Sequence, residues 1–358
     1  MTQNGDAPTP FPRFDVVPDH SDHAYAAVSS KKQNYDGSVH KTIMKEWRVL
    51  ENNLPDSIFV RVYNTRIELL RAVIVGAAGT PYHDALFFFD IKFPPDYPTR
   101  PPIVHYRSYG LRVNPNLYAS GYVCLSLLNT WIGKKREKWD PAQSTVLQVL
   151  LSIQALVLNE KPYFNEPGTG SPGGSGVEKR SRAYNEDAFV LTCKTTLYLL
   201  RNPPRNFEAF TAVFFRERGS RILRACGAYV NARVGVGCYR DEGELETSTQ
   251  KPRVVWDVSK KFKASMQELY PQLVQVFKKN GALDLVEVLE VEAKTTPVKV
   301  EAKTKTVKVR VDKKAKIGIA KKVIGKLRKF LGLSKKKNQK MEKSDEKKDV
   351  NAGVAVGC

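Results

Sequence analysis

Cys124 stands among apolar residues, eight positions after the last residue of an Asn-Pro-Asn turn, Asn114-Pro115-Asn116. A thiol can attack an acyl group, and an amide donor beside it can stabilise the oxyanion that forms. The turn could bring a side-chain amide close to the thiol, so the pair suggests acyl transfer. A lone cysteine with apolar neighbours is also commonly a small buried core residue. On these residues alone, the catalytic and the structural interpretations have equal weight.

The elements that precede this stretch predict a sheet packed with helices. Residues 40–52 carry apolar side chains at three- and four-residue spacing, which predicts a helix. Successive strand-like runs with short turns between them predict a four-stranded antiparallel meander, at residues 58–63, 66–75, 85–93 and 103–106.

Two proline signals frame the cysteine. Residues 93–102 hold five prolines, which remove five backbone donors and predict a rigid extended connector in which one peptide bond could be cis. Downstream, Asp140 is a good N-cap with Pro141 at the first helical position. These residues therefore predict a buried helix that begins there and runs to about residue 159.

A glycine-rich run follows at residues 168–176 and contains the glycine spacing of a dinucleotide loop. Such a loop needs a strand before it and a helix directly after it, whereas here a helix precedes the run and a proline interrupts it. We therefore interpret the run as a linker. Further helices are expected beyond it, at residues 185–201, 206–215, 218–231 and 258–279.

Composition limits the class of protein. The 358 residues are 42% hydrophobic, which supports a folded core, and the net charge of +21 suggests an anionic partner. Five cysteines without a CxxC pair argue against a disulfide framework and a zinc module, and favour a reducing compartment, cytoplasmic or nuclear. No secretory signal and no membrane span are expected.

The two ends of the chain differ from its centre. Residues 1–36 are expected to be a mobile arm, in which His20 and His23 lack a third ligand, so no metal site is predicted. In residues 291–349, 21 lysines and arginines stand against 7 acids. Residues 313–333 would form a basic amphipathic helix, suited to an anionic membrane surface, an acidic partner or nucleic acid. A solvated low-complexity tail is an equally good interpretation.

The order of helix, meander, connector, turn, cysteine and tryptophan resembles the core of the ubiquitin-conjugating enzymes. The motifs that match are Phe93-Pro94-Pro95-Asp96-Tyr97-Pro98 with Pro101-Pro102, Asn114-Pro115-Asn116, Cys124-Leu125 and Trp139-Asp140-Pro141. The stretches NPNLY, VCLSLLNTW and PYFNEPG look closest to the large hybrid conjugating enzyme-ligases of animals and plants.

The resemblance implies an α+β fold. The core would consist of an N-terminal helix, a four-stranded antiparallel meander and C-terminal helices. The expected organisation is a disordered arm (1–36), a conjugating core (37–168), a Gly/Ser-rich linker (169–181), a helical extension (182–282) and a disordered basic low-complexity tail (283–358) with its amphipathic segment (313–333).

The resemblance also implies roles for residues of the site. Cys124 would be the nucleophile that accepts ubiquitin as a thioester and passes it to a substrate lysine. Asn116 would donate to the oxyanion or hold the loop that does. Asn114 stands where the family commonly has a histidine that shapes the loop. The acidic position of the family's active-site gate falls on Asn165 or Glu166.

Partners follow from the same resemblance. They are ubiquitin, an activating enzyme, and a ubiquitin ligase or substrate proteins, and no cofactor is expected here because the activating enzyme uses the ATP. The ligase-binding surface would include residues of the first helix, the connector and the segment after Trp139, namely Lys41, Lys45, Arg48, Thr99, Pro141 and Ala142. The basic loop at 132–138 could lower the thiol pKa or select acidic substrates, and a solvated loop is an equal alternative.

Other classes of function are weaker on these residues. An inactive conjugating-like scaffold is the main alternative, although inactive relatives lack the cysteine. A dedicated nucleic-acid binder would need a zinc finger, an aromatic RNA-binding strand or a helix-turn-helix, and none is evident. The sequence therefore predicts a ubiquitin-conjugating transferase.

Overall fold

The computed structural model describes residues 11–27, 35–131, 133–169, 173–240 and 257–282. All of them lie in the first of two compact units, Met1–Pro297. The predictions for the tail, including its amphipathic segment 313–333, fall outside the described residues and stay predictions. Along the described part of the chain, no helix is long and apolar enough to cross a membrane.

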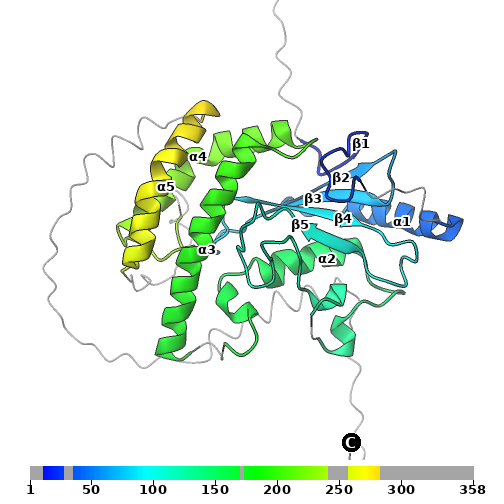
Figure 1. Ribbon diagram of the computed structural model, residues 1–358, viewed down its shortest axis with the longest axis horizontal. Coiled ribbons are helices and arrows are strands. Elements are labelled where there is room, and N and C mark those ends of the chain that lie inside the picture. The colour runs from blue at the N-terminus through cyan, green and yellow to red at the C-terminus, as the bar shows by residue number, and fades with distance from the viewer. Residues whose placement is uncertain (1–10, 28–34, 132, 170–172, 241–256, 283–358) are drawn as a thin grey trace, which may run out of the picture. The chain divides into compact units, whose positions relative to one another are not determined.

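A five-stranded sheet forms the centre of this unit (Figure 1). The predicted antiparallel meander is confirmed, and it is joined by one parallel strand that pairs with its first strand. In spatial order the strands are β1 (Phe14–Val17), β2 (Ile58–Tyr63), β3 (Leu69–Val75), β4 (Leu86–Lys92) and β5 (Ile103–Tyr106).

The parallel strand β1 corrects the expectation of a mobile arm for residues 11–27. The ring of Phe11 lies 4.8 Å from the ring of Phe210, and Asp22 pairs with the buried Arg71 at 2.7 Å. His23, expected in solvent, is 4% exposed and shares a hydrogen bond of 3.0 Å with the carbonyl of Leu70. This segment is ordered because it pairs with a sheet edge and buries aromatic and charged side chains.

Helices α1 (Gly37–Asn53) and α2 (Val146–Ser152) cover one face of the sheet. The α1 helix matches the prediction and is capped by Asp36, whose carboxylate accepts from the backbone amides of Ser38 and Val39. The start predicted for α2 is wrong. Asp140 caps only a turn, and the helix begins after Thr145, which forms a reciprocal capping box with Gln148.

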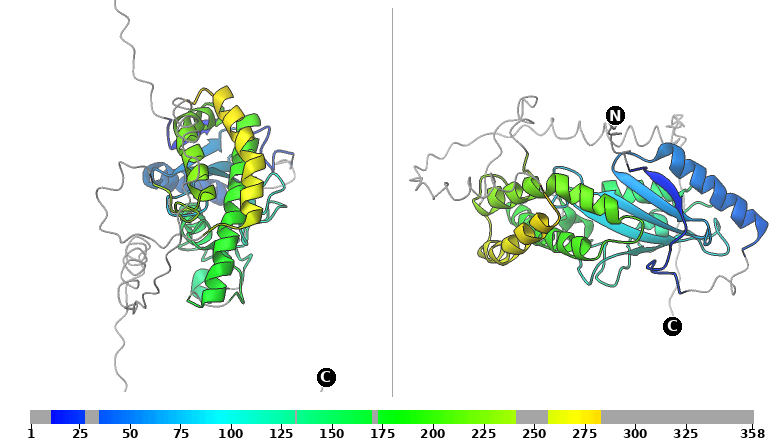
Figure 2. Two further views of the ribbon diagram at one scale, coloured as in Figure 1. Left: turned by 90° about the vertical axis from the view of Figure 1, so that its left-hand side faces the viewer. Right: turned by 90° about the horizontal axis from the view of Figure 1, so that it is seen from above.

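The opposite face of the sheet is covered by the helical extension. Val73, Leu86 and Phe88 point into a second core built with helices α3 (Ser175–Arg201), α4 (Glu208–Val230) and α5 (Lys260–Lys279). Figures 1 and 2 show these three helices gathered together beside the sheet, away from α1. Because both faces are covered, every residue of β4 is buried.

The extension departs from the prediction in two places. Helix α3 begins inside the expected linker, and one continuous α4 replaces two predicted helices. Gly219 lies in the middle of α4, where a Cβ atom would come within 3.1 Å of Phe277 and 3.0 Å of Ala282. It therefore marks a close approach of α5 rather than the end of a helix.

Candidate active site

A tight hairpin carries Cys124 back to the Asn-Pro-Asn turn. Tyr118 and Tyr122 bond through their backbones at 3.0 Å, and Gly121 turns the chain with a φ of +86°. A Cβ atom on Gly121 would come within 2.1 Å of the His105 ring, so the position requires glycine. The amide of Cys124 then donates to the carbonyl of Asn116 at 2.9 Å.

Asn116 and Cys124 are thus bonded to each other twice. The Nδ2 atom of Asn116 donates to the carbonyl of Cys124 at 2.9 Å, in addition to the backbone bond. Asn116 is 8% exposed, and its buried Oδ1 has no hydrogen-bond partner among the described residues. The arrangement fixes the backbone on both sides of the thiol.

Asn114 is fully buried and ties the turn to its surroundings. Its Nδ2 donates to the hydroxyl of Tyr82 at 2.8 Å and to the carbonyl of Val157 at 2.7 Å. Its Oδ1 accepts from the amide of Asn116 at 2.9 Å and from Asn165 at 3.3 Å. These bonds are those of a loop-shaping residue.

The two candidates at the gate face different ways. The gate is the segment 159–168, which contains a 3₁₀ turn at Pro162–Asn165. Asn165 points inward and donates to Asn114 and to the carbonyl of Val157. Glu166 points outward, half-exposed, with its carboxylate 3.6 Å from the Arg112 guanidinium. Only Glu166 therefore brings an acidic group to the rim of the site.

The thiol of Cys124 lies in a mostly buried position, since the residue is 4% exposed. Burial raises the thiol pKa above its ordinary value, a hydrogen bond with Tyr118 and the charge of Arg112 oppose this, and Glu166 adds to it. The Arg112 guanidinium lies 4.4 Å from the centre of the Tyr118 ring, in a cation–π contact.

Tyr118 and Arg112 were not predicted from the sequence. The hairpin could have pointed to Tyr118, because a strand pair that closes on Cys124 brings position 118 back beside it. Of the alternatives left open for the basic loop, a lowered thiol pKa gains no support. From Gly133 onward the loop is described, and its charges are not among the groups that shift the pKa of Cys124.

The residues predicted for ligase binding are all exposed, as an interface requires. Lys41, Lys45 and Arg48 lie on α1. The indole of Trp139 donates to the carbonyl of Pro98 at 2.7 Å, which ties the segment that carries Thr99 to the segment that carries Pro141 and Ala142. The Tyr97-Pro98 bond is cis.

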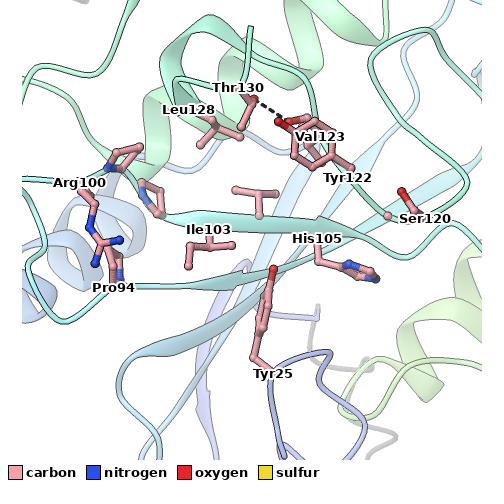
Figure 3. Close-up of a pocket in the computed structure, with 14 residues that line it drawn as sticks. Tyr25, Pro94, Arg100, Ile103, His105, Ser120, Tyr122, Val123, Leu128 and Thr130 are labelled. Atoms are coloured by element: carbon pink, nitrogen blue, oxygen red, sulfur yellow. Dashed lines mark hydrogen bonds between the residues drawn. The ribbon is translucent and has the colours of Figure 1, made fainter. Parts of the chain in front are cut away.

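Two open grooves flank the site. One groove of about 480 Å³ runs between β5 and the hairpin that precedes Cys124. Its wall includes Arg100, Ile103, His105 and Tyr122 (Figure 3). The other, of about 380 Å³, is bounded by Arg112 and the gate on one side and by α3 on the other. No group of three or more metal-ligating side chains occurs in the described ranges.

Comparison with known proteins decides the family. The family model "Ubiquitin-conjugating enzyme" matches residues 42–189. A putative ubiquitin-conjugating enzyme E2 38 of Arabidopsis thaliana is 47% identical over 279 residues, which are 77% of this chain and 84% of that protein. The chain belongs to the ubiquitin-conjugating enzyme family. The predicted family and α+β fold class are therefore confirmed.

Two further relatives are longer than this chain. The probable ubiquitin-conjugating enzyme E2 25 of Arabidopsis thaliana is 56% identical over 222 residues, which are 62% of this chain and 36% of that protein. The human dual E2 ubiquitin-conjugating enzyme/E3 ubiquitin-protein ligase BIRC6 is 35% identical over 241 residues, 62% of this chain and 5% of that protein. The chain thus spans about a third or less of these two relatives.

Proposed function

We propose that this chain accepts ubiquitin from an activating enzyme as a thioester on Cys124 and transfers it to lysine side chains of proteins. The observation that carries this proposal is the pair of hydrogen bonds between Asn116 and the backbone of Cys124, which fixes the backbone that carries the thiol. Membership of the ubiquitin-conjugating family supports it.

The chemistry is two acyl transfers. The Cys124 thiolate attacks the ubiquitin thioester of the activating enzyme, whose own thiolate leaves. A deprotonated lysine amine then attacks the new thioester, the tetrahedral oxyanion collapses to an amide, the amine loses its proton and the Cys124 thiolate leaves. Asn116 either donates to that oxyanion or holds the loop that does, and Glu166 orients the amine.

The raised pKa of Cys124 fits this sequence of steps. A thiol that is protonated at rest resists oxidation and unwanted acylation. The hydrogen bond from Tyr118 and the Arg112 charge are then available to stabilise the thiolate when it attacks or leaves.

A charging assay tests the proposal. Full-length protein is incubated with activating enzyme, ATP and ubiquitin, and a ubiquitin adduct that reductant cleaves is expected. Cys124→Ser should give either an oxyester that reductant leaves intact or no adduct, whereas Cys238→Ser, at a half-buried cysteine, should charge normally. Absence of an adduct on folded wild-type protein would instead support an inactive scaffold.

Hybrid ligase character is a finer part of this proposal, supported by similarity to the dual enzyme-ligase. Transfer to substrate without an added ligase would support it, and strict dependence on one would contradict it. No resident cofactor is proposed, since ATP is used by the activating enzyme. The proposed location is the cytoplasm or nucleus, with the basic tail as a contact to anionic membranes or nucleic acid.

A further inference from the structure

Helix α3 lies along the outer side of the gate. The ammonium of Lys161 lies 2.8 and 2.7 Å from the two carboxylate oxygens of Glu178. Further along the helix, the side chain of Asn185 donates to the carbonyl of Glu160 at 2.9 Å. The ring of Tyr184 lies 6.3 Å from that of Tyr163. The gate is therefore attached to α3 at three points, over about two helical turns.

The inner side of the gate is attached to the nucleophile turn. Asn159 donates to the side chain of Asn165 at 2.6 Å, and Asn165 in turn donates to Asn114. Asn114 accepts from the amide of Asn116, which holds Cys124. A continuous series of hydrogen bonds thus leads from the gate to the nucleophile.

Helix α3 is itself firmly held. Phe189, Cys193 and Leu197 are at most 5% exposed in the second core. The carboxylate of Glu186 accepts from the backbone and hydroxyl of Ser259, at the start of α5. The gate, by contrast, has only Pro162 buried in its 3₁₀ turn. The position of the gate therefore depends on the helix rather than the reverse.

We propose that Glu178 and Asn185 are positioning residues for transfer from Cys124, because they hold the gate through which the acceptor lysine approaches. This rests on the proposed function. The helical extension is then part of the transfer site, and its α3 forms the outer wall of the groove beside Glu166. Charging of Cys124 does not need the acceptor side of the site. Substitutions of Glu178 or Asn185 therefore slow transfer to lysine and leave charging unchanged.

The test compares charging with discharge to free lysine in the full-length chain. For Glu178→Gln we expect unchanged charging and about a fivefold lower maximal rate of discharge, the size of effect that loss of a partly exposed ion pair can cause. Asn185→Ser should also lower the maximal rate of discharge and leave charging unchanged. The charge swap Lys161→Glu with Glu178→Lys should restore discharge to within about twofold.

A matched control separates positioning from general stability. Lys261→Gln removes an ion pair of 2.7 Å between α5 and Asp187 of α3 without touching the gate, and it should leave discharge unchanged. The proposal is overturned if Glu178→Gln and Asn185→Ser discharge normally, if charging falls in parallel, or if Lys261→Gln slows discharge equally. A wild-type protein that fails to charge would contradict the proposed function instead.

Discussion

The side-chain amide of Asn114 donates a 2.7 Å hydrogen bond to the carbonyl of Val157, across 43 positions of sequence. Val157 ends a π-helical turn, Ile153–Val157, that continues α2. This bond therefore ties the Asn114-Pro115-Asn116 turn to the helix that follows Cys124. The same amide reaches the hydroxyl of Tyr82 on the loop before β4. A residue that is commonly histidine in this family is here an asparagine whose side chain bonds to four partners.

Asn114→Ala should therefore destabilise the fold and the site together. The change removes four hydrogen bonds of a fully buried side chain, at a cost of about 2–3 kcal/mol in the free energy of unfolding. Chemical denaturation measures that loss, and charging at a permissive temperature should slow. Arg48→Ala, at an exposed position of α1, is the control and should be close to neutral. An unfolding midpoint unchanged in Asn114→Ala would contradict this role.

Tyr118→Phe should shift the ionisation of Cys124 to higher pH. Burial raises the thiol pKa and the Tyr118 hydroxyl lowers it, so removing that hydroxyl leaves burial less opposed. The alkylation rate of Cys124 at neutral pH should fall about threefold to tenfold, since a side-chain hydrogen bond is typically worth about 1 kcal/mol. Peptide mapping after iodoacetamide, across a pH series, measures it. Tyr122→Phe is the control, and a profile that moves to lower pH would refute the assignment.

Asp90→Asn should remove an acid-sensitive part of the stability. Burial opposes ionisation of Asp90, but the guanidinium of Arg71, 2.6 Å away, outweighs it and holds the pKa at about 2. A depressed pKa stabilises the fold above the ordinary value near 4, and this stability is lost as the pH falls from about 4 to 2.

At neutral pH, Asp90→Asn should cost about 3–5 kcal/mol, because Arg71 is left buried without that charge. Its remaining stability should depend less on pH between about 4 and 2 than that of the wild type. Denaturation at several pH values measures both effects. Asp96→Asn, which breaks the exposed pair with Arg100, is the matched control and should cost under about 1 kcal/mol. Similar losses from the two variants would rule out the buried pair as the cause.

Truncation after Gly168 should make the core unstable. Val73, Leu86 and Phe88, each at most 1% exposed, lose the helices that cover them. Aggregation and binding of a hydrophobic dye are expected from the exposed patch. Changing the three residues to threonine in the truncated chain should restore some solubility. A truncated wild-type core that stays monomeric, with an unchanged melting temperature, would show that the extension is dispensable.

The sequence predicted the parts of the fold that local patterns determine. The meander followed from its successive strand-like runs with short turns, and α1 from its apolar spacing. The misplaced start of α2 shows two local signals in competition. Asp140-Pro141 matches an N-cap, yet Thr145 and Gln148 satisfy each other and the helix begins there. The break expected between residues 215 and 218 is absent, because α4 runs through it and packs on α5, a helix far along the chain.

The sequence predicted the site residues that belong to motifs. It did not predict the residues whose role depends on contacts between distant parts of the chain. Cys124, Asn114 and Asn116 were found from their spacing and resemblance. Arg112 was missed because its importance depends on Tyr118 and Glu166, which it meets only in the folded chain. His23 was placed in solvent because nothing local indicates that its ring is buried against Leu70.

The helices α3, α4 and α5, which cover the second face of the sheet, are synthesised after the strands that they cover. The last sheet residue that it hides, Phe88, leaves the ribosome long before α5, which ends at Lys279. At about 5–20 residues per second, the nascent chain carries that apolar face uncovered for on the order of ten seconds or more. Chaperones that bind extended apolar surface thus have a defined interval in which to act on this chain, and the interval closes only when the extension has been made.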